Sequence, residues 1–259
     1  MPDYLDTLAQ DAKETVAEGY YETLTQVSGP MFSLRKAITE TRRNAVITEV
    51  KAASPSRGTI KADFDPAEVA RAMENGGATG ISVLTEPKHF SGSLSYLAKV
   101  REAVGLPILM KDIIIDPIQI EAASIIGANV VLLIEDIFDR GYCELCLEEM
   151  IKQAHSKGLE VLLETHSEDE YQRAIETDAD LVGINNRDLR TLKVDLHITE
   201  RILRKHESRS KVVVSESGVM TPKDLLFLRG CGAQAFLIGS SVMMAENIEQ
   251  KVKEFVTAH

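Results

Sequence analysis

Tryptophan is absent from this chain of 259 residues, and cysteine occurs only 3 times. So few cysteines, in an odd number, do not indicate a disulfide framework. No stretch approaches the ~20 consecutive apolar residues that a membrane-spanning helix needs. The first residues also lack the basic and apolar regions of a secretory signal. We therefore expect a cytoplasmic protein that does not act at a membrane.

The cysteines do not indicate a metal site either. Cys143 and Cys146 have the C-x-x-C spacing of many zinc sites, but Cys231 is the only cysteine left to complete one. Cys143 shares helical spacing with Leu147 and Met150, so we interpret it as a small side chain of the core. We expect no bound metal.

Basic residues are too few to balance the acidic ones. The 29 Lys and Arg against 40 Asp and Glu give a formal net charge of −11. Such a charge repels nucleic acid and anionic membranes, and we expect neither as a partner. The composition, 44% hydrophobic and 27% charged, is otherwise that of an ordinary globular enzyme. A negatively charged substrate would need a local positive site.

The chain does contain a regular alternation of short apolar runs and amphipathic segments. Nearly continuous apolar runs of this length are typical of parallel strands that are buried on both faces. Several of the segments between them begin with helix-start signals, such as Asp65-Pro66, Asp116-Pro117, Thr221-Pro222 and the predicted capping box 167–170. The runs lie at 45–50, 80–84, 107–111, 129–134, 159–164, 181–185, 211–216 and 234–238.

Eight strand–helix repeats predict an α/β fold, a (β/α)8 TIM barrel with extra N-terminal helices, because such a barrel typically takes about 250 residues. The alternative is a doubly wound open sheet, which usually carries a glycine-rich dinucleotide turn after its first strand. Here the first strand continues instead as Glu49-Val50-Lys51-Ala52-Ala53. We expect one domain over 1–259, in which a helical extension (1–44) covers or borders one end of a barrel (45–259).

Polar side chains end five of the predicted strands. One such residue would be an ordinary solvated strand end, but the C-terminal ends of barrel strands meet at one mouth, where barrel enzymes have their active sites. Lysines and carboxylates that lie together can act as acids and bases, so this mouth is predicted to be catalytic. The residues are Glu49, Lys51, Lys111, Glu164, Asn185 and Glu216.

Two short turns of small residues follow the last two predicted strands. They are Glu216-Ser217-Gly218 and Gly239-Ser240-Ser241, at the usual phosphate position of a barrel. The sequence shows no nucleophile elbow, no metal-ligand motif and no nucleotide loop. We therefore expect proton-transfer chemistry on a sugar phosphate, without a cofactor.

These residues belong to segments that resemble the indole-3-glycerol phosphate synthase family, in order and over nearly the whole chain. The resemblance implies the closure of 1-(2-carboxyphenylamino)-1-deoxyribulose 5-phosphate to the indole ring, with loss of CO2 and water. This is a carboxy-lyase reaction of tryptophan biosynthesis. Besides Glu164, the matching segments are 49–56 (EVKAASPS), 84–86 (LTE), 90–93 (FSGS), 106–112 (LPILMKD), 183–189 (GINNRDL), 216–218 (ESG) and 235–241 (AFLIGSS).

The resemblance also implies roles for the residues. Lys111 would protonate the ketose carbonyl oxygen, and Glu164 would transfer protons during dehydration. Glu49, Asn185 and Glu216 would orient the lysines and the substrate hydroxyls. The substrate- and phosphate-binding residues would be Lys51, Ser54, Arg187, Ser217, Gly218, Gly239 and Ser240.

The sequence motifs say less about the roles of a few other residues near the predicted mouth. Leu84, Phe90 and Leu163 are candidates for the apolar wall that holds the anthranilate ring. Glu135 follows the fourth predicted strand, and we expect it to be a solvated loop residue. His166 lies close to Glu164 in sequence and is expected to be a loop histidine.

Two other functions are compatible with the pattern: a phosphoribosyl anthranilate isomerase, and a non-catalytic barrel that serves as a binding subunit. The isomerase chemistry would favour a Cys or Asp at strand ends over two lysines and a pair of glutamates. We expect a phosphorylated small-molecule substrate and a monomer or weak homo-oligomer.

Overall fold

The eight predicted strands close into one parallel barrel in the computed structural model, in the order β1-β10-β9-β8-β7-β6-β5-β4. This closure confirms the TIM barrel and excludes the open sheet. The structure describes residues 3–22, 24–27, 29–54, 58–60, 63–206 and 211–259, with the side chains of Ser54 and Thr59 left out. Pro55 and Ser56 of the first matching segment lie outside the described residues.

The strands agree with the predicted runs to within one residue at each end. Two further short strands, β2 (Ala53–Ser54) and β3 (Gly58–Thr59), pair in an antiparallel manner after β1. The barrel strands are β1 (Ala45–Val50), β4 (Gly80–Leu84), β5 (Ile108–Lys111), β6 (Val130–Ile134), β7 (Glu160–Thr165), β8 (Leu181–Asn185), β9 (Val212–Glu216) and β10 (Ala235–Ile238).

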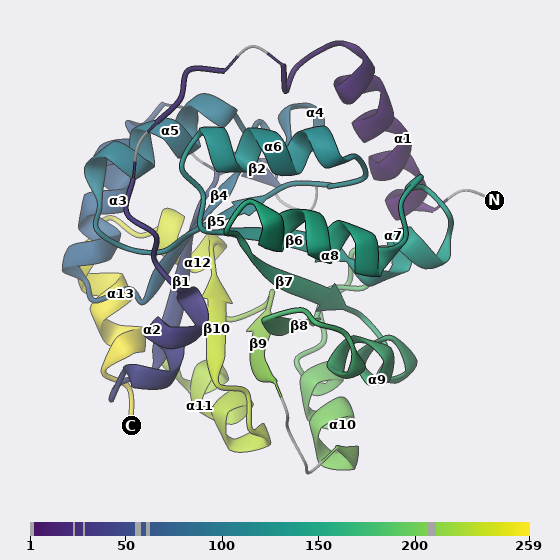
Figure 1. Cartoon of the computed structure of the whole chain (residues 1–259). Coiled ribbons are helices and arrows are strands. Elements are labelled where there is room, and N and C mark those ends of the chain that lie inside the picture. Colours follow the sequence, from purple (N-terminus) through teal and green to yellow (C-terminus); the bar gives the residue numbers. More distant parts are fainter. Residues whose placement is uncertain (1–2, 23, 28, 55–57, 61–62, 207–210) are drawn as a thin grey trace.

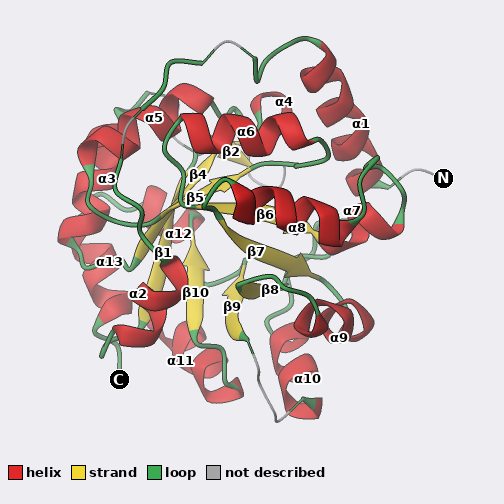
Figure 2. Ribbon diagram, viewed as in Figure 1, coloured by secondary structure: helices red, strands yellow, loops and turns green. Residues whose placement is uncertain are grey.

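The helices surround the strands (Figures 1 and 2). Asp65, Asp116 and Thr221 cap helices through their side chains, as their sequence signals predict. The helices are α1 (Tyr4–Ala17), α2 (Leu34–Glu40), α3 (Pro66–Asn75), α4 (Pro87–Phe90), α5 (Leu94–Ala103), α6 (Pro117–Ile125), α7 (Glu135–Asp139), α8 (Leu147–Ser156), α9 (Glu168–Glu176), α10 (His197–Lys205), α11 (Pro222–Cys231), α12 (Ser240–Met243) and α13 (Ile248–Val256).

The start of α9 differs from the predicted capping box. Ser167 Oγ accepts a hydrogen bond from the Glu170 backbone N–H, as predicted. The Glu170 carboxylate, however, accepts from the backbone N–H of His166 (2.7 Å), one residue before the expected position. Glu170 is thereby placed beside the side chain of His166.

Side chains of each strand alternate between the barrel interior and the helices. In β1, Ala45 and Ile47 belong to the inner apolar cluster and Val46 to the outer one. In β9, Val214 is inside and Val213 outside. Because side chains along a strand alternate with a period of two, Glu49 and Glu216 occupy the next inward positions after Ile47 and Val214. The polar strand ends therefore point into the mouth of the barrel.

The N-terminal helices lie at opposite ends of the barrel. Glu160, the first residue of β7, accepts hydrogen bonds from the backbone N–H groups of Leu34 and Arg35, which holds α2 at the N-terminal ends of the strands. The chain between the two helices runs along the outside of the molecule (Figure 1). At the other end, Tyr4 and Leu8 of α1 line the mouth. The N-terminal extension therefore covers the end of the barrel opposite the mouth with α2 and borders the site with α1.

Cys143 differs from its prediction in one respect. It precedes α8 and is not part of that helix, although it is partly buried against the inner cluster. Burial raises the pKa of its thiol to about 12. Cys143 is therefore a packed side chain, as expected, but helical spacing is not the reason.

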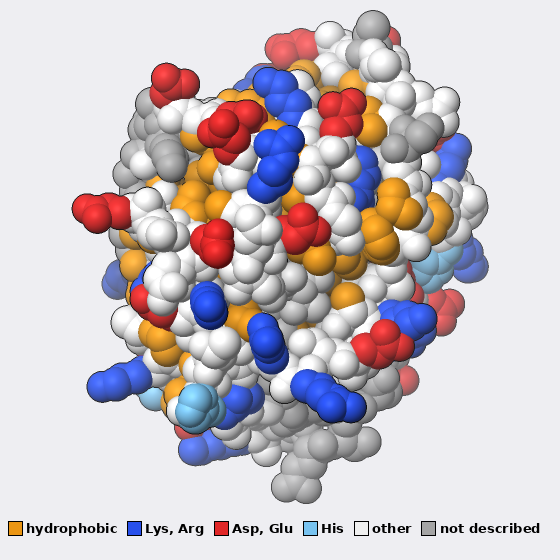
Figure 3. Space-filling model, turned by 90° about the vertical axis from the view of Figure 1, so that its left-hand side faces the viewer, with side chains coloured by type: hydrophobic (Ala, Val, Ile, Leu, Met, Phe, Trp, Pro, Cys, Tyr) orange, Lys and Arg blue, Asp and Glu red, His pale blue; other side chains and the backbone are white. Residues whose placement is uncertain are grey.

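On the face shown in Figure 3, acidic and basic side chains are interspersed. Within the described part of the chain, none of the helices has the length and apolar character required to cross a membrane.

Candidate active site

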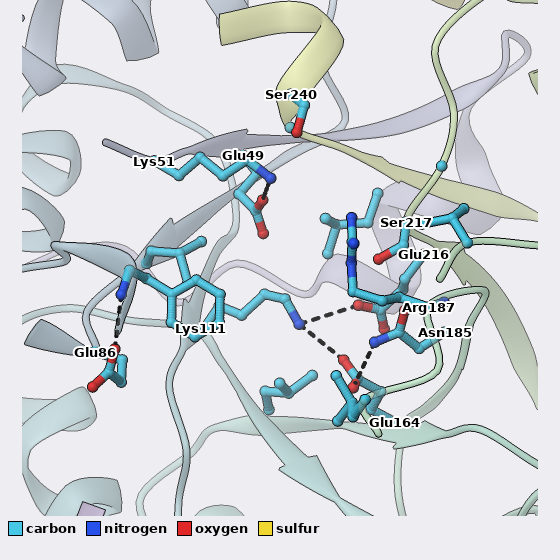
Figure 4. Close-up of a pocket in the computed structure, with 18 of the residues that line it drawn as sticks. Glu49, Lys51, Glu86, Lys111, Glu164, Asn185, Arg187, Glu216, Ser217 and Ser240 are labelled. Carbon is cyan, nitrogen blue, oxygen red and sulfur yellow. Dashed lines mark hydrogen bonds and ion pairs between the residues drawn. The ribbon is translucent and has the colours of Figure 1, made fainter. Parts of the chain in front are cut away.

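A cavity of about 250 Å³ opens at the C-terminal ends of the strands. Strand register brings its polar residues together: Glu164 of β7 lies opposite Gly183 of β8, and Asn185 of β8 lies opposite Glu216 of β9. Each predicted catalytic residue lines this cavity: Glu49, Lys51, Lys111, Glu164, Asn185 and Glu216 (Figure 4).

Lys111 is at the centre of this group. Its Nζ lies 2.9 Å from Glu164 Oε2 and 3.3 Å from Glu216 Oε2. Asn185 Nδ2 donates a hydrogen bond to the other oxygen of Glu164, Oε1, at 2.9 Å. Glu164 and Glu216 are both almost fully buried. One ammonium group thus faces two buried carboxyl groups.

The two carboxyl groups have different proton affinities. Burial alone would raise the pKa of Glu164, but Lys111, His166 and Asn185 outweigh it and hold that pKa below its usual range. Burial and the negative charge of Glu164 raise the pKa of Glu216 to about 8, against the opposing effect of Lys111. Near neutral pH, these shifts favour the ionised form of Glu164 and the protonated form of Glu216. Two carboxyl groups whose pKa values are pushed apart can serve as a base and a proton donor in one site.

Lys111 keeps its own proton in the resting site. Burial lowers the pKa of its ammonium group, but Glu164, Glu216 and Glu49 outweigh burial and raise it above the usual range. The charged Lys111 can stabilise and then protonate an oxygen on which negative charge develops.

Two glycines make room for the carboxyl groups. A Cβ atom on Gly183 would overlap Glu216 Oε1, and one on Gly239 would overlap Glu49 Oε1. Glu216 Oε1 is buried and finds no hydrogen-bond partner among the described residues. Sequence reasoning missed Gly183, although a glycine within an otherwise apolar strand is a known sign of a close approach.

Lys51 lies beside the last of the small-residue turns. Its Nζ forms an ion pair with Glu49 Oε1 (2.8 Å), and a Cβ on Gly239 would lie 2.8 Å from the same Nζ. Ser240 begins the short helix α12 directly after Gly239. This arrangement gives the acidic protein a positive group next to backbone N–H groups, as an anion site requires.

The other turn has an unusual backbone. Ser217 and Gly218 have positive φ angles of 65° and 90°. Asn186 Nδ2 donates to the backbone oxygens of Glu216 (3.0 Å) and Ser217 (3.3 Å), and so supports the turn from below. A serine with a positive φ angle is rare, because this backbone conformation costs energy for a residue with a side chain. Such strained residues often lie at functional sites.

The remaining predicted binding residues are Arg187 and Ser54. Arg187 lines the cavity, and its guanidinium group donates to the backbone oxygen of Leu192 (2.9 Å). The backbone of Ser54 lies in β2, and its side chain lies outside what the structure describes.

The apolar wall agrees with the prediction at two positions of three. Leu84 and Phe90 line the cavity, whereas Leu163 lies in the outer cluster. Since Glu164 points inward, its neighbour Leu163 must point outward. Sequence reasoning missed much of the wall: Tyr4, Leu8, Leu132, Ile134, Leu189 and Leu192.

The region between α1 and the mouth contains further polar contacts that the sequence did not reveal. Tyr4 Oη lies 3.2 Å from His89 Nδ1, and His89 Nε2 lies 2.6 Å from Asp11 Oδ2. The buried Asp112 accepts a hydrogen bond from Tyr21 Oη (3.1 Å). These contacts hold the N-terminal extension against the loops after β4 and β5.

The prediction for Glu135 is wrong. Glu135 is buried, and Arg173 of α9 binds both of its oxygens, at 2.6 and 2.8 Å. Because Ile134 faces the barrel interior, Glu135 faces outward, where α9 covers it. Exposure could not be deduced from sequence, since the partner lies far along the chain.

His166 is in a loop, as expected, and its side chain lies close to two glutamates. Its Nε2 lies 3.2 Å from Glu164 Oε1 and its Nδ1 3.5 Å from Glu170 Oε2. Among the described residues, no group of three or more His, Cys, Asp and Glu side chains is arranged to hold a metal ion.

Comparisons with known proteins agree on one family. The family model of indole-3-glycerol phosphate synthase matches residues 4–255. A protein of that name from Methanocaldococcus jannaschii is 46% identical over 227 residues, covering 86% of this chain and 82% of its own. Another, from Neisseria meningitidis serogroup B, is 42% identical over 254 residues, covering 96% and 95%.

Solved structures with lower identity share the fold. Thiamine phosphate pyrophosphorylase from Pyrococcus furiosus has a TM-score of 0.61 at 18% identity, over 86% of this chain and 96% of its own. The N-acetylmannosamine-6-phosphate 2-epimerase from Clostridium perfringens has a TM-score of 0.60 at 14% identity, over 83% and 93%.

Proposed function

The chain belongs to the indole-3-glycerol phosphate synthase family, and from this premise we propose how its residues carry out the reaction of that family. The substrate is 1-(2-carboxyphenylamino)-1-deoxyribulose 5-phosphate, and the products are indole-3-glycerol phosphate, CO2 and water. The single observation that carries the assignment of roles is the network in which Lys111 Nζ contacts both Glu164 and Glu216.

Lys111 acts as the general acid of ring closure. The ring carbon that bears the carboxylate attacks the ketose carbonyl carbon, and the carbonyl oxygen takes the Lys111 proton to become a hydroxyl group. The new bond interrupts the aromatic ring. Loss of CO2 returns the bonding electrons to the ring and restores aromaticity, so this step needs no further acid.

Glu164 acts in dehydration. The hydroxyl group must leave with a proton as water, while the five-membered ring loses a proton to form the indole double bond. Glu164, as an ionised and buried carboxylate, is suited to accept that ring proton. Asn185 holds Glu164 Oε1 at 2.9 Å and fixes the orientation of the base.

Glu216 orients the substrate as a neutral carboxylic acid. Because Glu216 keeps its proton at neutral pH, it can donate a hydrogen bond to a substrate hydroxyl, which an ionised carboxylate cannot do. Its buried and unpartnered Oε1 supports such a role, because a buried oxygen without a partner is normally satisfied by a ligand.

Lys51 and the two small-residue turns bind the anions. Lys51, held by Glu49, faces the anthranilate carboxylate or the phosphate. Arg187 supports the loop or the anionic substrate, and Ser54 is a further proposed substrate-binding residue. The phosphate would be bound by Ser217, Gly218, Gly239 and Ser240. The wall formed by Leu84 and Phe90 holds the aromatic ring.

An indole-fluorescence assay with the carboxyphenylamino substrate tests the proposal. Purified protein should form product without an added metal or cofactor, because each step needs only proton transfer and charge stabilisation. A protein that binds the substrate but does not turn it over would be a binding subunit, and the assignment of roles would then be wrong. The cytoplasmic location, the single domain and the monomeric or weakly homo-oligomeric state stay predictions.

The ionisation of Glu216 predicts a pH dependence. If Glu216 must be protonated, kcat/KM should fall as pH rises through about 8, the pKa of this carboxyl group in the free folded protein. In Glu216→Gln, which keeps a neutral donor, that decline should be absent or shifted. The same raised pKa means that Glu216 stabilises the fold fully below its ordinary pKa of 4.5 and loses this contribution as pH rises through about 8. A decline in kcat/KM that is identical in Glu216→Gln would contradict the role.

Gly183→Ala should damage the site more than the fold. The added Cβ overlaps Glu216 Oε1, so the flexible carboxyl group must move while the backbone need not. We expect kcat to fall about 10–100-fold with a small change in melting temperature, because a displaced catalytic group is costly even at 1 Å. Gly230→Ala is the matched control, since a Cβ there meets no atom of the described residues within 4 Å. An active Gly183→Ala enzyme would show that Glu216 need not lie where it does.

A further inference from the structure

The side chain of His166 joins two regions of the molecule. The first is the catalytic mouth, where Glu164 lies. The second is a separate cavity of about 890 Å³ that is lined by residues of α9, α10 and the loop after β8, and that includes His166 itself. The ring therefore lies between the proposed base and a polar cavity outside the barrel.

We propose that His166 is a positioning residue for the reaction: its imidazolium ring, which lies at ion-pair distance from Glu164 and Glu170, keeps the Glu164 carboxylate ionised after Lys111 gives up its proton. Its Nε2 has no hydrogen-bond partner among the described residues, so the contact with Glu164 is one of charge. The inference rests on the roles proposed above for Lys111 and Glu164. It assigns to His166 no direct contact with the substrate.

The first argument comes from the cations around Glu164. In the resting site Glu164 has Lys111 at Oε2 (2.9 Å) and His166 at Oε1 (3.2 Å). Ring closure transfers the Lys111 proton to the substrate, and the ammonium group becomes a neutral amine. His166 is then the cation that remains in contact with this buried carboxylate. Without it, Glu164 would be a buried carboxylate beside another carboxyl group, where the charged form is strongly disfavoured.

The second argument comes from the substrate. It brings a carboxylate and a phosphate into the mouth, and both negative charges disfavour ionisation of Glu164. The dehydration step nevertheless needs Glu164 as a base. A fixed positive charge on the side of Glu164 that faces away from the substrate meets this requirement without blocking the cavity.

The third argument is that His166 is held in its charged form. Burial alone would lower the pKa of His166, but the carboxylates of Glu164 and Glu170 outweigh it and raise the pKa to about 10. Glu170 also accepts from the His166 backbone N–H at 2.7 Å, so it fixes both the backbone and the ring.

The other charges around the second cavity are largely paired with one another and leave His166 to the two glutamates. They come from α7, the start of α9, the loop after β8 and α10. The ion pairs are Arg140 with Asp136, Lys205 with Glu168, Arg190 with Asp188, Arg201 with Asp195, and Arg204 with Glu200.

The test compares pH profiles of kcat for the whole enzyme and its variants. His166→Gln and His166→Asn keep a hydrogen-bond donor but remove the charge. We expect kcat at pH 7 to fall about tenfold, with KM changed less than about twofold. The acidic limb of the profile should move up by about 1–3 pH units, the usual effect of losing one adjacent opposite charge. His155→Gln, at an α8 histidine that pairs with Asp180, is the matched control and should behave as wild type.

The variant Glu170→Gln tests whether His166 acts through its positive charge or only by packing the loop after β7. The amide still accepts from the His166 backbone, and Glu164 still keeps the ring protonated below neutral pH. We expect a smaller loss of kcat at pH 6.5 than in His166→Gln, because the ring keeps its positive charge. If His166 only packed the loop through the Glu164–His166–Glu170 chain, Glu170→Gln would be as impaired as His166→Gln, and that result would overturn the proposal.

Imidazole 15N NMR gives a readout that does not depend on folding of the His166 variants. In the wild-type enzyme, His166 should remain protonated past pH 8. Titration at its ordinary pKa of 6.5, or a wild-type pH profile in His166→Gln, would overturn the inference. If Glu164→Gln is fully active, the proposed role of Glu164 fails. If Glu164→Gln is inactive while His166→Gln matches wild type, only the present inference fails.

Discussion

Replacing Lys111 with alanine should lower kcat/KM about a thousandfold, the combined order of magnitude for losing a general acid and its charge at a developing oxyanion. Lys111 is the ammonium group that contacts both Glu164 (2.9 Å) and Glu216 (3.3 Å). Without it, Glu216 loses the cation that it contacts, Glu164 keeps only His166, and the carbonyl oxygen has no proton source. The loss should appear mainly in kcat, measured by indole fluorescence.

The control is Lys152→Ala, at an exposed lysine on α8 outside the mouth. Lys111→Arg is an informative third variant. It keeps the positive charge, but a guanidinium group scarcely releases a proton, so it should restore little of the lost rate. If Lys111→Ala retained normal turnover, another group would supply the proton and the proposed mechanism of ring closure would be wrong.

Replacing Glu164 with glutamine should lower kcat about 100–1000-fold, in the usual range for a general base. The amide is of similar size and can still contact Lys111 and Asn185, so the fold should be kept while the proton acceptor is lost. Because the loss concerns a proton transfer and not binding, KM should change little. Single-turnover measurements should show the enzyme stalled before dehydration.

Glu102→Gln is the matched control, since Glu102 is an exposed carboxylate on α5. Comparison with Glu216→Gln sharpens the result. Glu216 is already protonated at neutral pH, so the same substitution there should cost less at pH 7 than at Glu164. Equal losses at both positions would mean that the two carboxyl groups do not differ in protonation as their surroundings indicate.

Much of the fold could be predicted because its signals are local. The strand ends agree with the apolar runs to within one residue, since β-branched side chains buried on both faces make strands recognisable. Asp65-Pro66 and Thr221-Pro222 begin helices for reasons contained in a few neighbouring residues. The strand ends also predicted which polar residues line one cavity, because barrel strands deliver their last inward side chains to the same mouth.

The error at Glu135 concerns a partner that is distant in sequence, because Arg173, on another helix, binds and buries it. His166 is in a loop, as predicted, but its contacts with Glu164 and Glu170 depend on side-chain positions that the sequence did not indicate. Leu163 is a different case, because it adjoins Glu164 in the same strand. Strict alternation along that strand is enough to turn the Leu163 side chain away from a mouth into which Glu164 points.

The sequence by itself determined the eight strands, the helix starts and the identity of the polar groups at the mouth, because propensity, capping and alternation act over short stretches of chain. Only the tertiary structure decided which carboxyl group keeps its proton. That difference depends on distances across the barrel, where Glu164 meets Lys111, His166 and Asn185 while Glu216 meets Lys111 alone among cations within the part of the chain that the structure describes. The residues adjacent in sequence do not reveal this difference in pKa, since burial and Coulomb interactions act through space and not along the chain.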